Sequence, residues 1–242
     1  MPIADFQLVF GNRQLEISRQ TPIQWQSTPT LSGGSRTILE VNQLGCIRGD
    51  RRVFSGLDFS LSPGTFLQLT GPNGSGKTSL LRILCGLLAP AEGTVKWKGA
   101  NIGSFDEEYF TQVTYIGHRS GVKDELTPLE NLRISSALTG VEVDENSALN
   151  VLQRLGLKGR ESIPSRLLSE GQRRRVALSR LVICKTELWL LDEVTSSLDK
   201  SAVELIRSLI EEHLTSGGMA IVATHQELSV ARGRSERLEL KT

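Results

Sequence analysis

The sequence predicts an α/β protein with a mostly parallel core sheet and flanking helices. From Ile38 onward, short apolar and β-branched runs alternate with segments of helical periodicity. The run 188–191 is apolar without interruption, as in a parallel strand buried on both faces. A glycine-rich segment, 71–76, separates a predicted strand from a predicted helix. Together these observations favour a parallel sheet covered by helices.

The predicted strands and helices follow in a regular order. The strands are Ile38–Val41, Phe66–Thr70, Thr94–Trp97, Val113–Gly117, Leu188–Asp192, Ala220–Thr224 and Arg237–Leu240. The helices are Lys77–Leu88, Glu170–Cys184 and a third after Asp199, in which Val203, Ile206, Ile210 and Leu214 recur at helical spacing.

We expect one domain preceded by an extension. Residues 1–37 hold no sustained strand or helix period, so we predict a poorly ordered N-terminal extension. It lacks the apolar core of a secretory signal, and an organelle transit peptide is the alternative. Residues 38–242 are the predicted domain, and the segment from about Thr127 to Leu168 is predicted to be a helical insert within it.

Composition excludes several classes of function. The 242 residues hold 28 Lys and Arg against 27 Asp and Glu, a net charge of +1, so we expect no attraction to nucleic acid or anionic lipid. No apolar run reaches the ~18 to 20 residues that span a bilayer, so we predict no direct membrane insertion. The scattered cysteines Cys46, Cys85 and Cys184 indicate buried, reduced thiols.

Residues 71–78, Gly-Pro-Asn-Gly-Ser-Gly-Lys-Thr, match the phosphate-binding P-loop pattern. Glycines let backbone N–H groups turn toward a β-phosphate, and the following helix N-terminus adds its positive dipole end. Lys77 supplies charge to the β- and γ-phosphates, and the Thr78 hydroxyl is placed to ligate Mg²⁺. The predicted nucleotide-binding residues are Gly71, Pro72, Asn73, Gly74, Ser75, Gly76, Lys77, Thr78 and Ser79.

Two carboxylates, Asp192 and Glu193, follow the apolar strand at its carboxyl end. Asp192 can hold Mg²⁺, directly or through water, and Glu193 can polarise the water that attacks a γ-phosphate. A pair of acids opening a solvated loop is the alternative. His225 follows another predicted strand and should reach the same edge of the sheet. The predicted catalytic residues are Glu193, His225 and Lys77, and the predicted metal ligands are Thr78 and Asp192.

The segment Leu168-Ser-Glu-Gly-Gln172 opens the predicted helix 170–184. Ser169 with Gln172 forms a capping box, while a helix N-terminus with a serine and the bare Gly171 backbone is also an anion site. Both interpretations are open from the residues alone. We expect the arginines 173–175 on a solvated face and assign His213 no role.

Five ordered motifs together resemble the nucleotide-binding cassette of ABC transporters. They are the P-loop, Leu168–Gln172, Leu188–Glu193, Ser197-Leu-Asp199 and Thr224-His225. The resemblance covers about residues 38–242 and implies an ATP-hydrolysing P-loop NTPase cassette with an N-terminal antiparallel β region and a helical subdomain, here about 119–172. It implies ATP and Mg²⁺ as cofactors.

The same resemblance implies two copies that pair head to tail and enclose two ATP molecules. Ser169, Gly171 and Gln172 of one copy would then face the ATP held by Lys77 of the other. Asp199 would lie in the loop that crosses the interface, and His225 would be the family's switch histidine.

Segments 115–123 and 126–132 are similar to those of the ATPase subunit of cytochrome c maturation (heme-export) complexes. This implies a subunit that energises integral membrane partners in heme export or in heme release from its chaperone, without itself binding heme. It implies a peripheral location on the cytoplasmic face of the bacterial inner membrane, or on the matrix face of the mitochondrial one. The alternatives are an exporter of another substrate, a soluble ABC-type ATPase, and a nucleotide-gated module that hydrolyses little.

Three positions depart from the family pattern. Arg119 stands where a glutamine usually contacts Mg²⁺; a permanent cation cannot ligate a metal, although it can donate to phosphate. Val194 replaces the usual proline. No aromatic residue near Gly49 is placed to stack on adenine, and the candidates for that contact are Arg51, Arg52 and Phe54.

Overall fold

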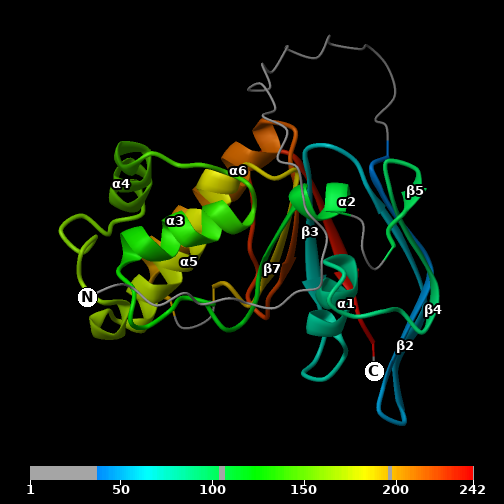
Figure 1. The fold of residues 1–242 in the computed structure, drawn as a ribbon. Coiled ribbons are helices and arrows are strands. Elements are labelled where there is room, and N and C mark those ends of the chain that lie inside the picture. The colour runs from blue at the N-terminus through cyan, green and yellow to red at the C-terminus, as the bar shows by residue number, and fades with distance from the viewer. Residues whose placement is uncertain (1–36, 104–106, 196–197, 242) are drawn as a thin grey trace, which may run out of the picture. The chain divides into compact units, whose positions relative to one another are not determined.

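The computed structural model describes residues 37–103, 107–195 and 198–241. These residues belong to one compact unit. Two sheets and a set of helices make up this unit (Figure 1). The predicted N-terminal extension lies outside the described residues except for Thr37. The fold class predicted from the sequence is confirmed.

A five-stranded parallel sheet forms the centre of the unit. Its order is β6 (Val113–Ile116), β7 (Leu188–Asp192), β8 (Met219–Ala223), β3 (Thr65–Thr70) and β9 (Arg234–Glu239). Every residue of β7 and β8 is buried, which explains their unbroken apolar sequences. The carboxyl ends of β3, β7 and β8 lie at one edge, because Ala223 pairs with both Leu69 and Asp192. The three loops that follow these strands therefore meet there.

A second, antiparallel sheet is built from N-terminal strands, as the resemblance implied, with β3 of the parallel sheet lying between its second and third strands in the chain. Its order is β2 (Arg51–Leu61), β1 (Leu39–Arg48), β4 (Glu92–Trp97) and β5 (Ala100–Asn101). The sequence did not predict β2 or β5, and it ended β1 seven residues early, at Val41. Strands β1 and β2 form a hairpin in which Arg48 pairs with Arg51 across two residues, the first of them Gly49 with φ +58°.

Six α-helices connect the described strands. They are α1 (Lys77–Leu84), α2 (Glu107–Thr111), α3 (Pro128–Leu138), α4 (Glu145–Arg154), α5 (Glu170–Cys184) and α6 (Lys200–Thr215), with a short 3₁₀ turn at Ser165–Leu167. The bounds of α5 are those predicted, whereas α1 ends four residues early. Gly86, just beyond α1, has φ +72°, and a Cβ there would lie 2.4 Å from the Phe110 ring.

Helices α3, α4 and α5 pack together at one end of the unit (Figure 1). Their shared apolar cluster contains Leu132, Ala148, Leu152, Leu157, Leu168 and Val176. Helices α3 and α4 lie within the predicted insert. This cluster is separate from the two that surround the parallel sheet, so α3 and α4 contribute a small core of their own.

His213 on α6 is a packed residue, although the sequence assigned it no role. Its ring stacks on Trp189 of β7, with centroids 3.8 Å apart and planes 4° apart. Its Nε2 donates to the Met219 carbonyl oxygen at 3.1 Å. A Cβ on Gly218 would collide with this ring, so the glycine makes room for the histidine.

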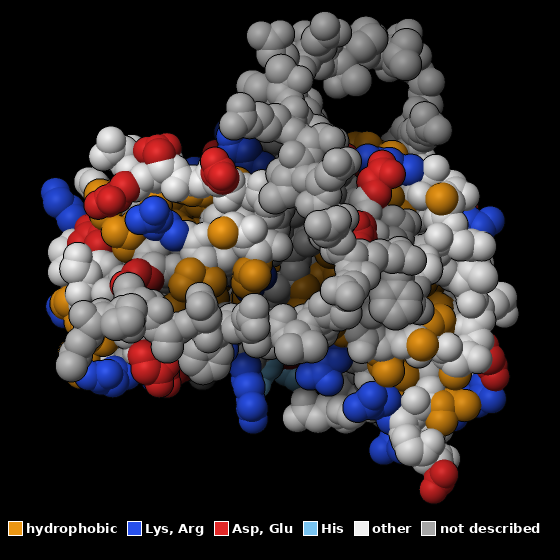
Figure 2. Space-filling model, viewed as in Figure 1, with side chains coloured by type: hydrophobic (Ala, Val, Ile, Leu, Met, Phe, Trp, Pro, Cys, Tyr) orange, Lys and Arg blue, Asp and Glu red, His pale blue; other side chains and the backbone are white. Residues whose placement is uncertain are grey.

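The surface mixes polar and apolar side chains. On the face in Figure 2, acidic and basic side chains are interspersed over the helical elements, with hydrophobic ones among them. The described helices include none that is both long enough and apolar enough to cross a membrane. The cysteines are free; Cys46 and Cys85 are buried as expected, and Cys184 is partly exposed. Burial raises the pKa of Cys85 to about 11.

Candidate active site

The P-loop forms the turn from β3 into α1. Gly71 and Gly76 have φ values of 140° and 100°, which side chains rarely allow. A Cβ on Gly71 would lie 2.4 Å from the Leu240 carbonyl oxygen, and one on Gly76 would lie 2.5 Å from a Val53 methyl group. Both glycines are therefore required by the backbone conformation and by close neighbours.

Helix α1 differs from the other long helices at its N-terminus. Helices α3, α4, α5 and α6 are each capped by a side chain that accepts a backbone N–H bond, from Thr127, Asp144, Ser169 and Asp199. Helix α1 begins after Gly76, which makes no side-chain cap. The first backbone N–H groups of α1 are thus available to a bound anion such as a phosphate.

Lys77, Thr78 and Asp192 come together at the start of α1. The Lys77 side chain is buried against the loop, where Nζ donates to the carbonyl oxygens of Gly71 at 2.8 Å and Pro72 at 3.1 Å. The Thr78 hydroxyl donates to Asp192 Oδ1 at 3.2 Å. The two predicted metal ligands are therefore neighbours, and both offer the oxygen atoms that Mg²⁺ prefers.

Tyr115 of β6 is a site residue that the sequence did not single out. Its hydroxyl donates to Asp192 Oδ2 at 3.4 Å. Burial, and next the charge of Asp192, raise the pKa of Tyr115, so its hydroxyl keeps the proton it donates. Its place beside Asp192 follows from the pairing of β6 with β7, which no local pattern reveals.

Glu193 and His225 meet as predicted. His225 Nε2 lies 3.3 Å from Glu193 Oε1, and the Glu193 side chain is the more buried of the two. Glu193 has φ +53°, an uncommon conformation for a residue other than glycine. Its backbone N–H donates to the Ala223 carbonyl oxygen at 2.9 Å, which ties the turn after β7 to β8.

The start of α1, the acidic pair and His225 line one cleft of about 650 Å³. Its walls include Asn73, Gly74, Gly76, Lys77, Thr78, Ser79, Asp192, Glu193 and His225, together with Arg48, Arg51, Val53 and His118. Of the three predicted adenine-stacking candidates, only Arg51 is among these residues. Arg52 pairs with Glu92 at 2.9 Å, and Phe54 is buried. Arg48 pairs with Arg51 across the β1–β2 hairpin. The sequence did not point to Arg48, because β2 and this hairpin were not predicted.

Arg119 lines a neighbouring cleft of about 600 Å³, together with Arg82 and Arg180. It is exposed and is not among the described residues that line the first cleft. Thr78, His118 and Asp192 line both clefts, so the two adjoin each other. Val194 is fully buried in the cluster on one face of the parallel sheet, where the family usually has proline.

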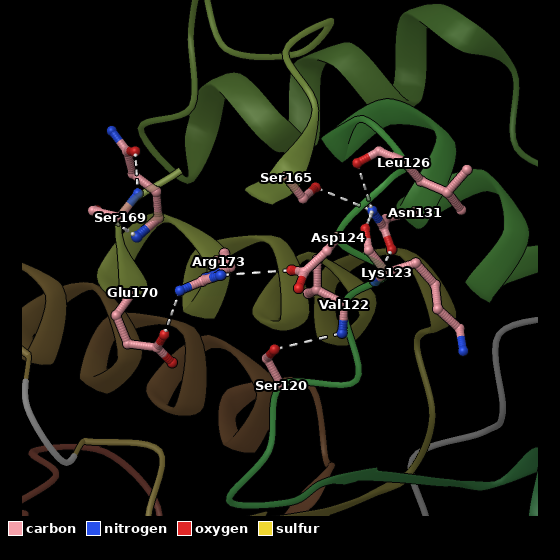
Figure 3. Close-up of polar contacts among 11 residues, drawn as sticks. Ser120, Val122, Lys123, Asp124, Leu126, Asn131, Ser165, Ser169, Glu170 and Arg173 are labelled. Carbon is pink, nitrogen blue, oxygen red and sulfur yellow. Dashed lines mark hydrogen bonds and ion pairs between the residues drawn. The ribbon is translucent and has the colours of Figure 1, made fainter. Parts of the chain in front are cut away.

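Arg174 contradicts the expectation of a solvated basic face. It is 6% exposed, and its guanidinium donates to the carbonyl oxygens of Gly117, His118, Asp192 and Glu193. Arg173 is partly exposed and pairs with Glu170 at 3.0 Å and Asp124 at 3.5 Å (Figure 3). The sequence offers no local signal that separates these neighbouring arginines.

The segment 168–172 forms the capping box that the sequence predicted. Ser169 Oγ accepts from the Gln172 N–H at 3.2 Å, and Gln172 Oε1 accepts from the Ser169 N–H at 3.0 Å (Figure 3). Asp199 caps α6, and its hydrogen bonds with Ser201 and then with the Ala202 N–H lower the pKa of its carboxyl. Ser169, Gly171, Gln172 and Asp199 are not among the described residues lining the first cleft, and Ser197 lies outside the described residues.

Comparisons with known proteins agree with this geometry. The family model described as ABC transporter matches residues 54–196. The chain is 56% identical to the "Cytochrome c biogenesis ATP-binding export protein CcmA" of Nitrosospira multiformis over 84% of this chain and 98% of that one. For the protein of the same name from Nitrosomonas europaea, the identity is 53% over 79% and 90%.

Two solved structures share the fold. The "Putative ABC transporter (ATP-binding protein)" from Pyrococcus furiosus has a TM-score of 0.71 and 25% identity, covering 83% of this chain and 96% of that one. The dimeric post-hydrolysis state of the ATP-binding cassette MJ0796, bound to ADP and Pi, has a TM-score of 0.69 and 24% identity, covering 78% and 88%.

Proposed function

The chain belongs to the ABC transporter family of ATP-binding proteins, and on that premise we propose that it is the ATP-hydrolysing subunit of an exporter in cytochrome c biogenesis. The observation that carries this proposal is the meeting of the P-loop, Asp192, Glu193 and His225 in one cleft. The high identity to proteins named for cytochrome c biogenesis favours this process over export of another substrate.

We propose a role for each group in the cleft. The N–H groups of the P-loop and Lys77 bind the phosphates of ATP, since they converge at the uncapped start of α1. Thr78 and Asp192 hold Mg²⁺, which when bound offsets the negative charge of the phosphates. Glu193 takes the proton of the attacking water, and His225 contacts the γ-phosphate and orients Glu193.

We propose that two copies pair head to tail, with Ser169, Gly171 and Gln172 of one facing the nucleotide of the other. Their position outside the cleft of their own chain supports this arrangement. Asp199 would lie in the crossing loop. The domain limits we propose are an extension at 1–37 and a cassette at 38–242, whose helical subdomain is about 119–172.

The proposed partners are integral membrane subunits. The proposed process is heme export or the release of heme from its chaperone, and this subunit itself does not bind heme. It would sit peripherally on the cytoplasmic face of a bacterial inner membrane; the matrix face of a mitochondrial inner membrane is the alternative. We expect no binding to nucleic acid. Stable binding of the purified chain to protein-free liposomes would contradict the need for a membrane partner.

Glu193→Gln tests the hydrolytic role. We expect ATP turnover to fall by at least about 100-fold, the range that a general base contributes, while ATP stays bound and the dimer persists. Glu187→Gln is a matched control, because Glu187 directly precedes β7 at its other end and pairs with Lys98 on the surface. Unchanged turnover in Glu193→Gln would remove Glu193 from the role of base.

Deletion of the gene for this chain, followed by staining for covalently bound heme in c-type cytochromes, tests the proposed role in cytochrome c biogenesis. We expect the staining to disappear on deletion, to return with the wild-type chain, and to stay absent with Glu193→Gln. Normal staining in the deletion strain would favour export of another substrate.

A further inference from the structure

Arg174 contacts the carboxyl ends of two neighbouring strands. Its Nη1 donates to the carbonyl oxygens of Gly117 at 2.9 Å and His118 at 3.1 Å, just beyond β6. Its Nη2 donates to those of Asp192 at 3.2 Å and Glu193 at 3.0 Å, at the end of β7. One planar group thus bridges the two main-chain segments that border the cleft.

Burying a cation at this position carries a desolvation cost, so the need to fill space does not explain why the residue is an arginine. Arg174 is 6% exposed, and its four acceptors are neutral carbonyl groups. Burial lowers the pKa of Arg174, while the charges of Glu170, Asp192 and Glu193 act in the opposite direction. An apolar side chain would fill the space without this desolvation penalty. What only arginine supplies is a rigid fork of donors that reaches two pairs of carbonyls at once.

The turn at Glu193 depends on such support. Its φ of +53° lies in a region that a non-glycine residue occupies only when its surroundings hold it there. Two main-chain bonds hold this residue: its N–H donates to Ala223, and its carbonyl oxygen accepts from Arg174. With the backbone in this conformation, the Glu193 carboxylate lies 3.3 Å from His225 Nε2.

The same arginine fixes the start of the loop that carries Arg119. The far end of that loop is held by Asn131 of α3, whose side chain accepts from the Lys123 N–H at 2.7 Å and donates to the Lys123 and Leu126 carbonyl oxygens (Figure 3). Helix α5, which begins after Ser169, is therefore connected through Arg174 to both this loop and the acidic pair.

We propose that Arg174 is a positioning residue for ATP hydrolysis: it holds the main chain of Glu193, and so aims the Glu193 carboxylate, from a helix whose N-terminus is the Ser169–Gln172 segment. A movement of α5 along its axis is thereby passed to the hydrolytic carboxylate. This inference rests on the proposed role of Glu193 as the base.

Arg174→Lys is the primary test, made in the full chain. Lysine keeps the charge but has a single nitrogen, which cannot serve four carbonyls in one plane. We expect kcat for ATP to fall at least tenfold and KM to stay within twofold, because the P-loop contacts are untouched. Arg173→Lys is the matched control: this neighbour forms partly exposed ion pairs that lysine can keep, so kcat stays within twofold.

A double variant separates positioning from a general structural role. In the Glu193→Gln background, Arg174→Lys is expected to lower the residual rate by less than twofold, since the carboxylate that it aims is gone. The same loss in both backgrounds would overturn the proposal. So would an unchanged kcat, or a raised KM at unchanged kcat, in Arg174→Lys alone.

A second variant tests the proposal if the lysine variant does not fold. Arg174→Gln leaves no charge to desolvate, and its amide can still donate to two carbonyls; the same loss of kcat is expected. If neither variant folds, Arg174 belongs to the core of the fold and the proposal is overturned. If Glu193→Gln itself leaves hydrolysis unchanged, the proposed base is wrong, whatever the Arg174 variants do.

Discussion

His213 gives the folded state a dependence on pH whose sign the structure fixes. Its ring is stacked on Trp189, and burial lowers the pKa of His213 from 6.5 to about 4. The hydrogen bonds to Met219 and Glu187 act in the opposite direction but are the smaller effects. Between these two pKa values the unfolded chain binds a proton that the folded chain does not. Stability is therefore lost as the pH falls from about 6.5 to about 4.

The magnitude follows from the same shift. A difference of about 2.5 pKa units is about 3 kcal/mol once the pH is below both values, at about 1.4 kcal/mol per unit. Between pH 7 and pH 5, the His213 contribution to the free energy of unfolding falls by about 2 kcal/mol. Above pH 7 the contribution is constant, since the ring is neutral in both states.

Urea unfolding of the wild type and of His213→Phe, each at pH 7 and pH 5, measures this effect. Phenylalanine keeps a flat ring against Trp189 but binds no proton. It leaves the Met219 carbonyl without this donor, so we expect it to be less stable at pH 7 by about 1 to 2 kcal/mol. The wild type should lose about 2 kcal/mol more than the variant on going to pH 5. An equal loss in the two proteins would refute the reasoning.

Three further substitutions probe the site and its supports. Gly76→Ala places a Cβ at φ +100° and 2.5 Å from a Val53 methyl group. We therefore expect the free energy of unfolding to fall by about 2 to 4 kcal/mol, and ATP binding, measured by calorimetry, to weaken. Unaltered ATP binding would argue against a tight loop. Thr78→Val keeps the volume of the side chain but removes the hydroxyl beside Asp192. The Mg²⁺ concentration that gives half-maximal hydrolysis should therefore rise at least tenfold. An unchanged Mg²⁺ titration would exclude Thr78 as a ligand. Asn131→Leu removes the side-chain hydrogen bonds to the Lys123 N–H and to the Lys123 and Leu126 carbonyl oxygens, so we expect a cost of about 2 to 4 kcal/mol, seen as a lower melting temperature. Wild-type melting would contradict the role of this side chain.

The features that the sequence predicted well are those encoded by neighbouring residues. The capping box at Ser169 and Gln172 is a local pattern, and α5 begins where it predicts. The apolar run before Asp192 indicates a strand that is buried on both faces of the sheet, and β7 has the predicted bounds. In the P-loop, the glycine spacing itself records where the backbone must take positive φ values.

The features that the sequence missed depend on contacts between distant segments. Strand β2 holds Gly56, Asp58 and several exposed residues, and only its pairing with β1 makes it a strand. The partners of Arg174 lie 57, 56, 18 and 19 residues away along the chain, so nothing near it predicts its burial. His213 sits in a polar stretch, and its partner Trp189 is on another element.

The capping box at the N-terminus of α5 is compatible with the anion site that the residues alone left open. As a cap, Ser169 Oγ uses a lone pair to accept the Gln172 N–H. A hydroxyl also carries a proton and a second lone pair, and neither is engaged by that bond. Donating this proton to a phosphate oxygen of nucleotide held by a second copy would therefore cost the helix none of its cap. Helix α1 would bind phosphate in another way. Gly76 provides no side-chain cap, so the first backbone N–H groups of α1 would themselves be the donors. In the proposed dimer the two helix ends would provide complementary phosphate contacts, one from backbone and one from a capping side chain, and a structural and a functional role would coincide at Ser169.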